Sequence, residues 1–122
     1  MSVTKQYLEY ALDQLDCVGP VAHKRMFGGV GLYFDGLFFG LIDDDILYFK
    51  VDDETRLKYE NANARAFQPY GEGSYSMSYY AVPAGVLEDR DKLKLWCKEA
   101  VDVARKKAMT KKGRTRKRKA KN

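Results

Sequence analysis

The segment from Arg25 to Val51 constrains the fold of this chain more than any other part of its sequence. It consists of three short apolar and aromatic runs, separated by Asp35-Gly36 and by the acidic run 43–45. Runs this short, rich in aromatic and branched residues, favour strands over helices. Asp-Gly between two such runs is a strong hairpin signal, because glycine accepts the positive φ of a type I′ turn. We therefore expect a three-stranded antiparallel meander with strands at 30–34, 37–42 and 46–51.

Both faces of this predicted meander carry apolar side chains. Leu37, Phe38 and Phe39 are consecutive, and so are the four apolar residues 46–49. Neighbouring strand residues point to opposite faces, so one face has to meet the chain's own helices. The other face has to be covered by further elements or by a second copy of the chain. The pattern indicates an interaction module and favours a homodimer.

Apolar residues at helical spacing predict helices on either side of the meander. The first is expected at about 4–15, and the last at about 91–108, capped by Asp89 and with a buried stripe of Leu93, Trp96, Cys97, Ala100 and Ala104. A short helix ending near 61, strands at 66–70 and 74–82 and a helical turn at 84–87 complete the order. The predicted fold class is α+β, with an antiparallel five-stranded sheet flanked by N-terminal and C-terminal helices.

The net charge of +5 is the sum of two opposed parts. Residues 1–104 contain 11 Lys/Arg and all 17 Asp/Glu, a charge of −6, whereas residues 105–122 contain the other 11 Lys/Arg and no acid, a charge of +11. We expect a folded domain over 1–108 and a disordered basic tail over 109–122. Charge density favours non-specific DNA or RNA binding by this tail over a solubilising role, through Lys111, Lys112, Arg114, Arg116, Lys117, Arg118, Lys119 and Lys121.

No pattern in the sequence predicts a catalytic residue, a cofactor or a metal site. His23 is the only histidine, so a metal site or a Ser-His-Asp triad would depend on it alone. Gly28 and Gly29 open a strand without a following Gly-Lys-Ser/Thr, which favours a bulge or a close backbone approach over a phosphate loop. Cys17 and Cys97 lack metal-ligand spacing and fit thiols in a reducing cytosol, although a disulfide between them stays open.

Membrane association and RNA binding by the sheet are the weaker interpretations of this sequence. No run approaches the roughly 20 apolar residues of a membrane span, and no signal-peptide pattern is present at the start. We therefore expect a cytoplasmic protein with no membrane partner. Tyrosines in the predicted strands would suit base stacking, but the acidic body would repel phosphates.

Several motifs follow one another in a family-specific order. They are RMFGGVG at 25–31, LFFGLI at 37–42, LYFKVD at 47–52, Phe67 with Pro69-Tyr70, MSYY at 77–80, Val82-Pro83, and LED at 87–89 leading to Trp96. Over residues 3–108 the chain thereby resembles the N-terminal domain of the TfoX (Sxy) family of bacterial competence regulators. The resemblance implies a fold similar to secretion-chaperone-like α+β domains. Its motif positions include Arg25, Met26, Phe27, Gly28, Gly29, Tyr48, Lys50, Tyr79 and Tyr80.

The resemblance implies a non-enzymatic regulatory or adaptor protein. The best-known family members stimulate transcription of DNA-uptake genes and carry a second, helical domain where this chain has its basic tail. The implied partner is a protein of the transcription machinery, with the tail adding non-specific nucleic-acid affinity. Two other hypotheses stay open. One is a ligand-binding protein or enzyme with a pocket near Arg25, Tyr48 and Lys50, and the other is a self-associating module with no nucleic-acid role.

Overall fold

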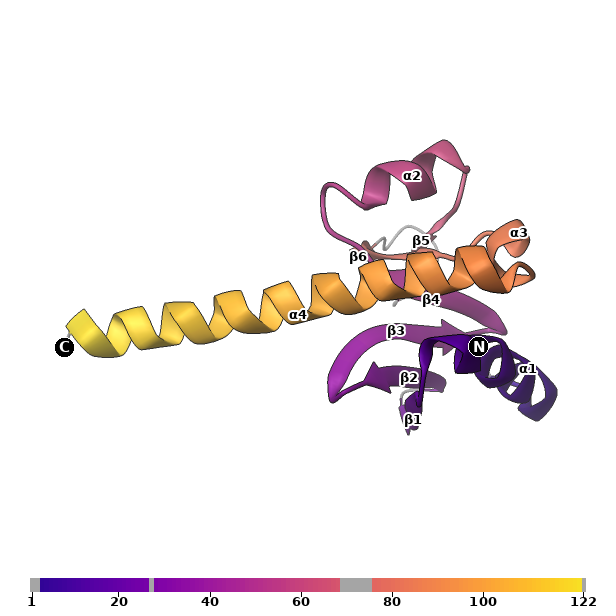
Figure 1. The fold of residues 1–122 in the computed structure, drawn as a ribbon, viewed down its shortest axis with the longest axis horizontal. Coiled ribbons are helices and arrows are strands. Elements are labelled where there is room, and N and C mark those ends of the chain that lie inside the picture. Colours follow the sequence, from indigo (N-terminus) through magenta and orange to yellow (C-terminus); the bar gives the residue numbers. More distant parts are fainter. Residues whose placement is uncertain (1–2, 27, 69–75, 122) are drawn as a thin grey trace.

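The computed structural model describes residues 3–26, 28–68 and 76–121, without the side chains of 76–77 and 110–121. It contains a six-stranded antiparallel sheet with helices packed on one face (Figure 1). The strands follow the order β1-β2-β3-β4-β6-β5 and are β1 Ala22–Met26, β2 Gly29–Phe34, β3 Leu37–Asp43, β4 Ile46–Lys50, β5 Ala66–Phe67 and β6 Ser76–Ala81. The helices are α1 Lys5–Leu15, the 3-10 turn η1 Asp16–Val18, α2 Arg56–Asn61, α3 Ala84–Leu87 and α4 Arg90–Lys121.

The predicted meander is confirmed as strands β2, β3 and β4. Asp35 and Gly36 both have positive φ, 53° and 77°, as a type I′ turn requires. Asp44 and Asp45 form a second such turn, with φ of 52° and 56°. Asp45 also accepts hydrogen bonds from the backbone N–H and the hydroxyl of Thr4, at 2.8 and 2.9 Å. The acidic turn therefore holds the start of α1 against the sheet.

The sheet has six strands where the sequence predicts five, and the additional strand is β1. Its side chains are exposed or half-buried, so no apolar alternation marks it in the sequence. It forms by backbone pairing with β2, from Ala22 opposite Tyr33 to Met26 opposite Gly29. The expected strands at 66–70 and 74–82 extend into residues 69–75, which lie outside the described part. Their described portions are β5 and β6, which pair antiparallel.

A β-bulge interrupts the pairing of β2 with β3. Leu32 lies opposite Gly40, but Tyr33 lies opposite Phe38, so Phe39 is the extra residue on β3. Phe39 is fully buried, and its ring centroid lies 6.0 Å from that of Phe49. Phe38 and Phe39 are neighbours on the strand and lie on opposite faces, Phe39 in the core and Phe38 against Tyr33 and Tyr79.

The face of the sheet that carries Phe39 packs against the helices and forms the core. Its strand residues are at most 5% exposed and are Val30, Leu32, Phe39, Ile42, Leu47, Phe49 and Tyr80. The predicted stripe of α4 is confirmed, because Leu93, Cys97, Ala100 and Ala104 are buried in this core and Trp96 packs at its edge. Asp89 caps α4 as expected, since its carboxylate accepts the N–H groups of Asp91 and Lys92 at 3.1 and 3.2 Å.

The last helix is longer than the sequence indicates. The expected end at about Ala108 is wrong as a helix boundary, since α4 continues to Lys121 and extends past the sheet (Figure 1). Residues 109–121 contain no proline and one glycine, and Lys, Arg and Ala are good helix formers. The expected disorder of the basic tail in the unbound chain stays a prediction.

The close packing of β3 on β4 gives the first prediction. A β-carbon at Gly40 would lie 2.6 Å from the carbonyl oxygen of Tyr48 and 3.3 Å from the Phe49 ring. We expect Gly40→Ala to lower the free energy of unfolding by about 1–3 kcal/mol in urea denaturation, because strands must separate to admit it. The control is Gly85→Ala, where the added carbon would point into open space. Equal stability of the two variants would contradict the close approach.

Candidate functional site

The second face of the sheet, turned away from the helices, carries a set of aromatic side chains around Lys50. We call this set the aromatic face; its members are Tyr33, Phe38, Tyr48, Lys50, Phe67 and Tyr79. The strand register places Tyr33 beside Phe38 and Lys50 beside Tyr79. Their rings form a chain of contacts, with centroid distances of 5.2 Å for Tyr33–Phe38, 5.8 Å for Phe38–Tyr79, 6.5 Å for Phe67–Tyr79 and 5.0 Å for Tyr48–Phe67. The apolar groups expected on both faces are therefore present.

Lys50 lies within this aromatic face. Its ammonium donates a hydrogen bond to the Tyr79 hydroxyl at 3.0 Å. It also lies 5.1 Å from the ring centroid of Tyr79 and 5.6 Å from that of Phe38, within cation–π range. Burial raises the pKa of Tyr79 to about 12, so its hydroxyl is a neutral acceptor at neutral pH. This hydrogen bond holds the Lys50 ammonium beside the Tyr79 hydroxyl.

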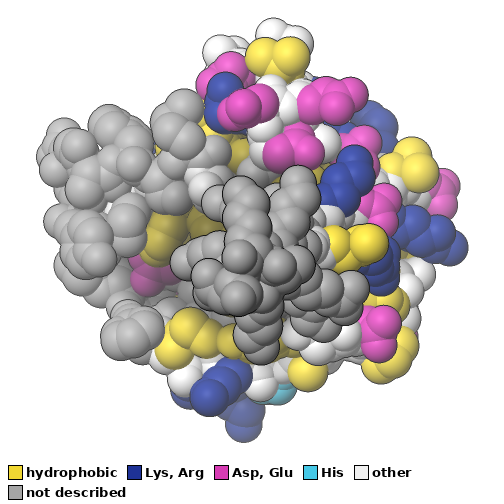
Figure 2. All heavy atoms as spheres, turned by 90° about the vertical axis from the view of Figure 1, so that its left-hand side faces the viewer, with side chains coloured by type: hydrophobic (Ala, Val, Ile, Leu, Met, Phe, Trp, Pro, Cys, Tyr) yellow, Lys and Arg dark blue, Asp and Glu magenta, His cyan; other side chains and the backbone are white. Residues whose placement is uncertain are grey.

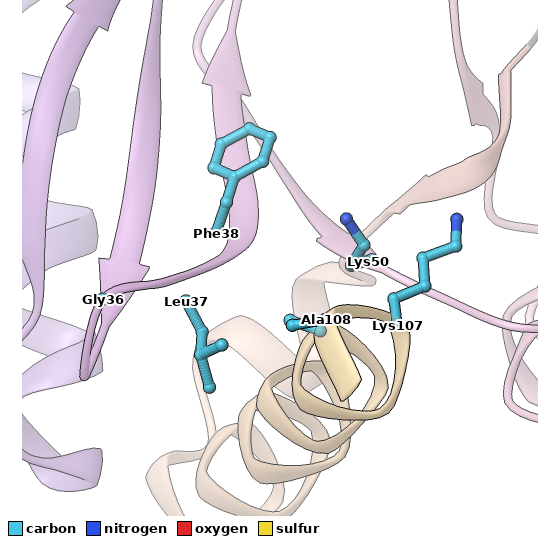
Figure 3. Close-up of a pocket in the computed structure, with 7 residues that line it drawn as sticks. Gly36, Leu37, Phe38, Lys50, Lys107 and Ala108 are labelled. Atoms are coloured by element: carbon cyan, nitrogen blue, oxygen red, sulfur yellow. The ribbon is translucent and has the colours of Figure 1, made fainter. Parts of the chain in front are cut away.

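A cavity of about 530 Å³ opens at the end of the sheet, where α4 leaves it (Figure 3). The start of β3 and the end of β4 meet at this end because the two strands are antiparallel. The described residues that line it come from the β2–β3 turn, from β3, from β4 and from α4, and they are Gly36, Leu37, Phe38, Lys50, Ala104, Lys107 and Ala108. The cavity thus joins the aromatic face to the root of the basic tail.

The structure brings together three of the family-motif residues. Tyr48, Lys50 and Tyr79 share the aromatic face, whereas Tyr80 points to the core and donates a hydrogen bond to Glu60 at 3.1 Å. Arg25 is exposed on β1, with two strands between it and β4. At about 4.8 Å per strand this separates their backbones by about 14 Å, so the structure does not bring Arg25 to Tyr48 and Lys50.

The motif around the two glycines forms a tight connection between β1 and β2. Gly28 has a φ of 81°, and a β-carbon at Gly29 would lie 2.7 Å from the carbonyl oxygen of Ile42. The expected close backbone approach is confirmed at Gly29. Met26 packs beside Gly31 on the aromatic face, since its methyl group would lie 2.6 Å from a β-carbon there. Phe27 lies outside the described residues.

The basic tail continues from a part of α4 that is anchored in the body. Ala104 is buried in the core and Lys107 lines the cavity, whereas the ion pair of Arg105 with Asp102 at 3.2 Å lies within α4 itself. The residues expected to contact phosphate lie in the part of α4 whose side chains the structure does not describe. They are Lys111, Lys112, Arg114, Arg116, Lys117, Arg118, Lys119 and Lys121. Their backbone lies within α4 up to Lys121.

The other titratable candidates lie apart from these features. Both cysteines are free thiols, and burial raises the pKa of Cys97 to about 12, which leaves it unreactive at neutral pH. Cys17 donates a weak hydrogen bond to the Gln14 carbonyl at 3.2 Å, and His23 is exposed on β1. Of the side chains that the structure describes, no three His, Cys, Asp or Glu could together hold a metal ion.

The surface on the side where α4 leaves the body carries both signs of charge. Figure 2 shows acidic and basic side chains interspersed there with hydrophobic ones. Among the helices of the described chain, none combines the length and the apolar character needed to cross a bilayer.

Sequence reasoning missed Tyr33, Phe38, Phe67 and Lys107 as parts of one site. Tyr48 and Lys50 are two apart on one strand, so a shared face could be predicted for them. The β3 bulge and the pairing of β4 with β6 decide which other side chains join them. No local signal specifies either feature.

Comparison with known proteins agrees with this architecture. The family model described as TfoX N-terminal domain matches residues 13–104, which extend from α1 to the last buried turn of α4. The basic tail lies beyond the matched residues. No curated protein matches the chain.

The contact between Lys50 and Tyr79 gives a prediction of energetic coupling. We expect Lys50→Met and Tyr79→Phe to show a coupling of about 0.5–1.5 kcal/mol in a double-mutant cycle measured by urea unfolding, because either substitution removes the same hydrogen bond. The control cycle pairs Tyr79→Phe with Lys98→Met, an exposed site on α4, and should be additive. Additivity in both cycles would show that the contact contributes nothing.

Proposed function

This chain belongs to the TfoX N-terminal domain family, and from that premise we propose that it is a non-enzymatic regulatory or adaptor protein. In this proposal the body contacts a protein partner of the transcription machinery. The basic tail adds affinity for DNA or RNA without sequence preference. Family membership suggests the role of the body, and the division of charge along the chain supports the role of the tail.

The observation that carries the nucleic-acid part of the proposal is the continuity of α4. One end of this helix is buried in the core through Leu93, Cys97 and Ala104, and its other end is the basic tail (Figure 1). At 1.5 Å per residue, the 13 residues 109–121 reach about 20 Å beyond Ala108. An α-helix of this kind fits the major groove of B-DNA, so the tail would bind phosphates in a fixed relation to the body.

Charge repulsion couples the helical state of the tail to binding. Eight of the eleven residues 111–121 are Lys or Arg, and like charges three or four positions apart destabilise a helix. Phosphates that neutralise these charges remove the repulsion. We therefore expect the helical turns of residues 109–121 to fray in the free chain and to be stabilised on nucleic acid.

The acidic body is suited to contact protein rather than phosphate. Its charge of −6 over residues 1–104 repels DNA and leaves the tail as the anchor. Exposed apolar side chains for a protein contact include Leu57 at 56% and Leu95 at 65%. The homodimer stays a prediction. The need for a second copy to cover an apolar sheet face is smaller than the sequence indicates, because the aromatic face is already half-buried within one chain.

Fluorescence anisotropy with duplex DNA tests the role of the tail. If about six tail residues contact phosphates, log K should fall with log salt at a slope of about −5 between about 50 and 300 mM salt. A chain ending at Ala108 should lose this binding. Replacing Lys111, Lys112, Arg114 and Arg116 with Gln should reduce the magnitude of the slope by about 2–4, at about 0.9 per lost contact.

The matched control removes the same charge from the body. Lys5, Lys92, Lys94 and Lys98 are exposed in the described structure and are also replaced with Gln. This variant should keep the slope of the full chain. If the two four-residue variants weaken binding equally, net charge rather than the tail explains the affinity. If the full chain does not bind, the nucleic-acid role is wrong.

A further inference from the structure

Strand β1 forms one edge of the sheet, and its outer side has no partner among the described residues. The strand order places β2 on one side of Ala22–Met26 and no strand on the other (Figure 1). In the described part of the chain, the only backbone hydrogen bonds of these five residues are those of the pairing with β2. Alternate N–H and C=O groups of an edge strand point outward, where they can pair with another extended chain. The edge can therefore accept an added strand.

The side chains of β1 form a run of basic residues. His23, Lys24 and Arg25 are consecutive, and all three are exposed. Figure 2 shows basic side chains gathered beside the only histidine of the chain, at the lower end of the molecule. Within the described residues, none of the three forms an ion pair or a side-chain hydrogen bond. This basic edge contrasts with the net charge of −6 over residues 1–104.

The register with β2 places the basic side chains on both faces of the edge. His23 and Arg25 lie opposite the core residues of β2, whereas Lys24 lies opposite Gly31 on the aromatic face. Side chains directly opposite each other on neighbouring strands interact. A strand added along β1 would therefore bring one of its own side chains beside each of the three.

The like charges of β1 select against a second copy of this chain. Two β1 strands related by a twofold axis would pair antiparallel, and pairing centred on Lys24 would place Lys24 opposite Lys24 and Arg25 opposite His23. Like charges directly opposite each other destabilise a sheet, and charged edges commonly prevent self-pairing in this way. A homodimer would have to use another surface. The same charges favour an added strand of opposite sign.

We propose that β1 binds an extended, acidic segment of a partner protein as an added strand of the sheet. Backbone hydrogen bonds to the outer side of β1 hold the segment. Three consecutive acidic residues of the segment lie beside His23, Lys24 and Arg25, and apolar residues flank them beside Ala22 and Met26. This inference names the surface and the chemistry of the protein contact proposed above and rests on that proposal, but it does not involve the basic tail.

NMR titration of the ¹⁵N-labelled full chain with the peptide Thr-Val-Glu-Glu-Glu-Val-Thr tests this inference. At a salt concentration of about 0.15 M, attraction between exposed charges is largely screened beyond about 8 Å. The peptide should shift the amide resonances of residues 22–26 until they saturate. N-methylation at alternate residues of the peptide, in one of its two phases, should abolish these shifts, because only alternate N–H groups face β1. N-methylation leaves the charge unchanged, so equal binding of the unmodified and both methylated peptides would overturn the proposal.

A charge-reversal variant separates the edge from the tail. Lys24→Glu/Arg25→Glu should weaken binding of the Glu peptide about tenfold. This variant should instead prefer the peptide Thr-Val-Lys-Lys-Lys-Val-Thr. The control Lys94→Glu/Lys98→Glu makes the same change of charge at exposed positions of α4 and should keep the preference for the Glu peptide. The dispersion of the same spectra shows whether each variant is folded.

Three outcomes would show that the proposal is wrong. Shifts confined to residues 109–122 would mean that the peptide binds the basic tail. Equal weakening by the two double variants would mean that net charge alone acts. An equal loss of duplex DNA binding and peptide binding in the β1 variant would assign the edge to phosphate. If the peptide fails to bind while duplex DNA binds with the expected salt slope, the edge proposal fails and the role of the tail stands.

Discussion

The packing of α4 on the core face of the sheet is the interaction on which the rest of this structure depends. Its buried stripe combines one large residue, Leu93, with the small Cys97, Ala100 and Ala104. Small side chains let the helix lie close to β3 and β4, where Phe39 and Phe49 fill the core. The same helix contacts α1, so one element connects the sheet, the N-terminal helix and the basic tail.

This packing gives the two ends of α4 different roles. The first turns bury an apolar stripe, whereas the later turns carry an excess of cations that contrasts with the net negative charge of the body. Between them, Ala104 is still buried, whereas Lys107 faces the cavity. A rotation of the helix about its axis would bury the lysine or expose the alanines. The register of α4 on the sheet therefore sets both the cavity and the direction of the tail.

Local chemistry accounts for the parts of the fold that were predicted from the sequence. Asp35-Gly36 specifies a hairpin turn, and Asp89 specifies the start of α4, because each acts on its nearest backbone groups. Strand β1 was missed because it is held by backbone pairing and has no apolar alternation. The sequence does not fix the end of α4, because two opposed effects act on its last residues. Repulsion between like charges disfavours a helix there, whereas the helix propensity of Lys, Arg and Ala favours one. The grouping of Lys50 with Tyr79 could not be predicted from local signals. Their strands, β4 and β6, are neighbours in the sheet but are separated in the sequence by α2 and β5.

Amide hydrogen exchange along α4, with and without duplex DNA, tests the central claim that one helix joins the core to a nucleic-acid anchor. The account predicts strong protection of residues 93–104 in both states, because these amides open only with the core. Residues 109–121 should exchange rapidly in the free chain and become protected when DNA is added. A tail that binds DNA but stays unprotected would contradict the account, since it would anchor the protein as a flexible polycation and not as an extension of α4.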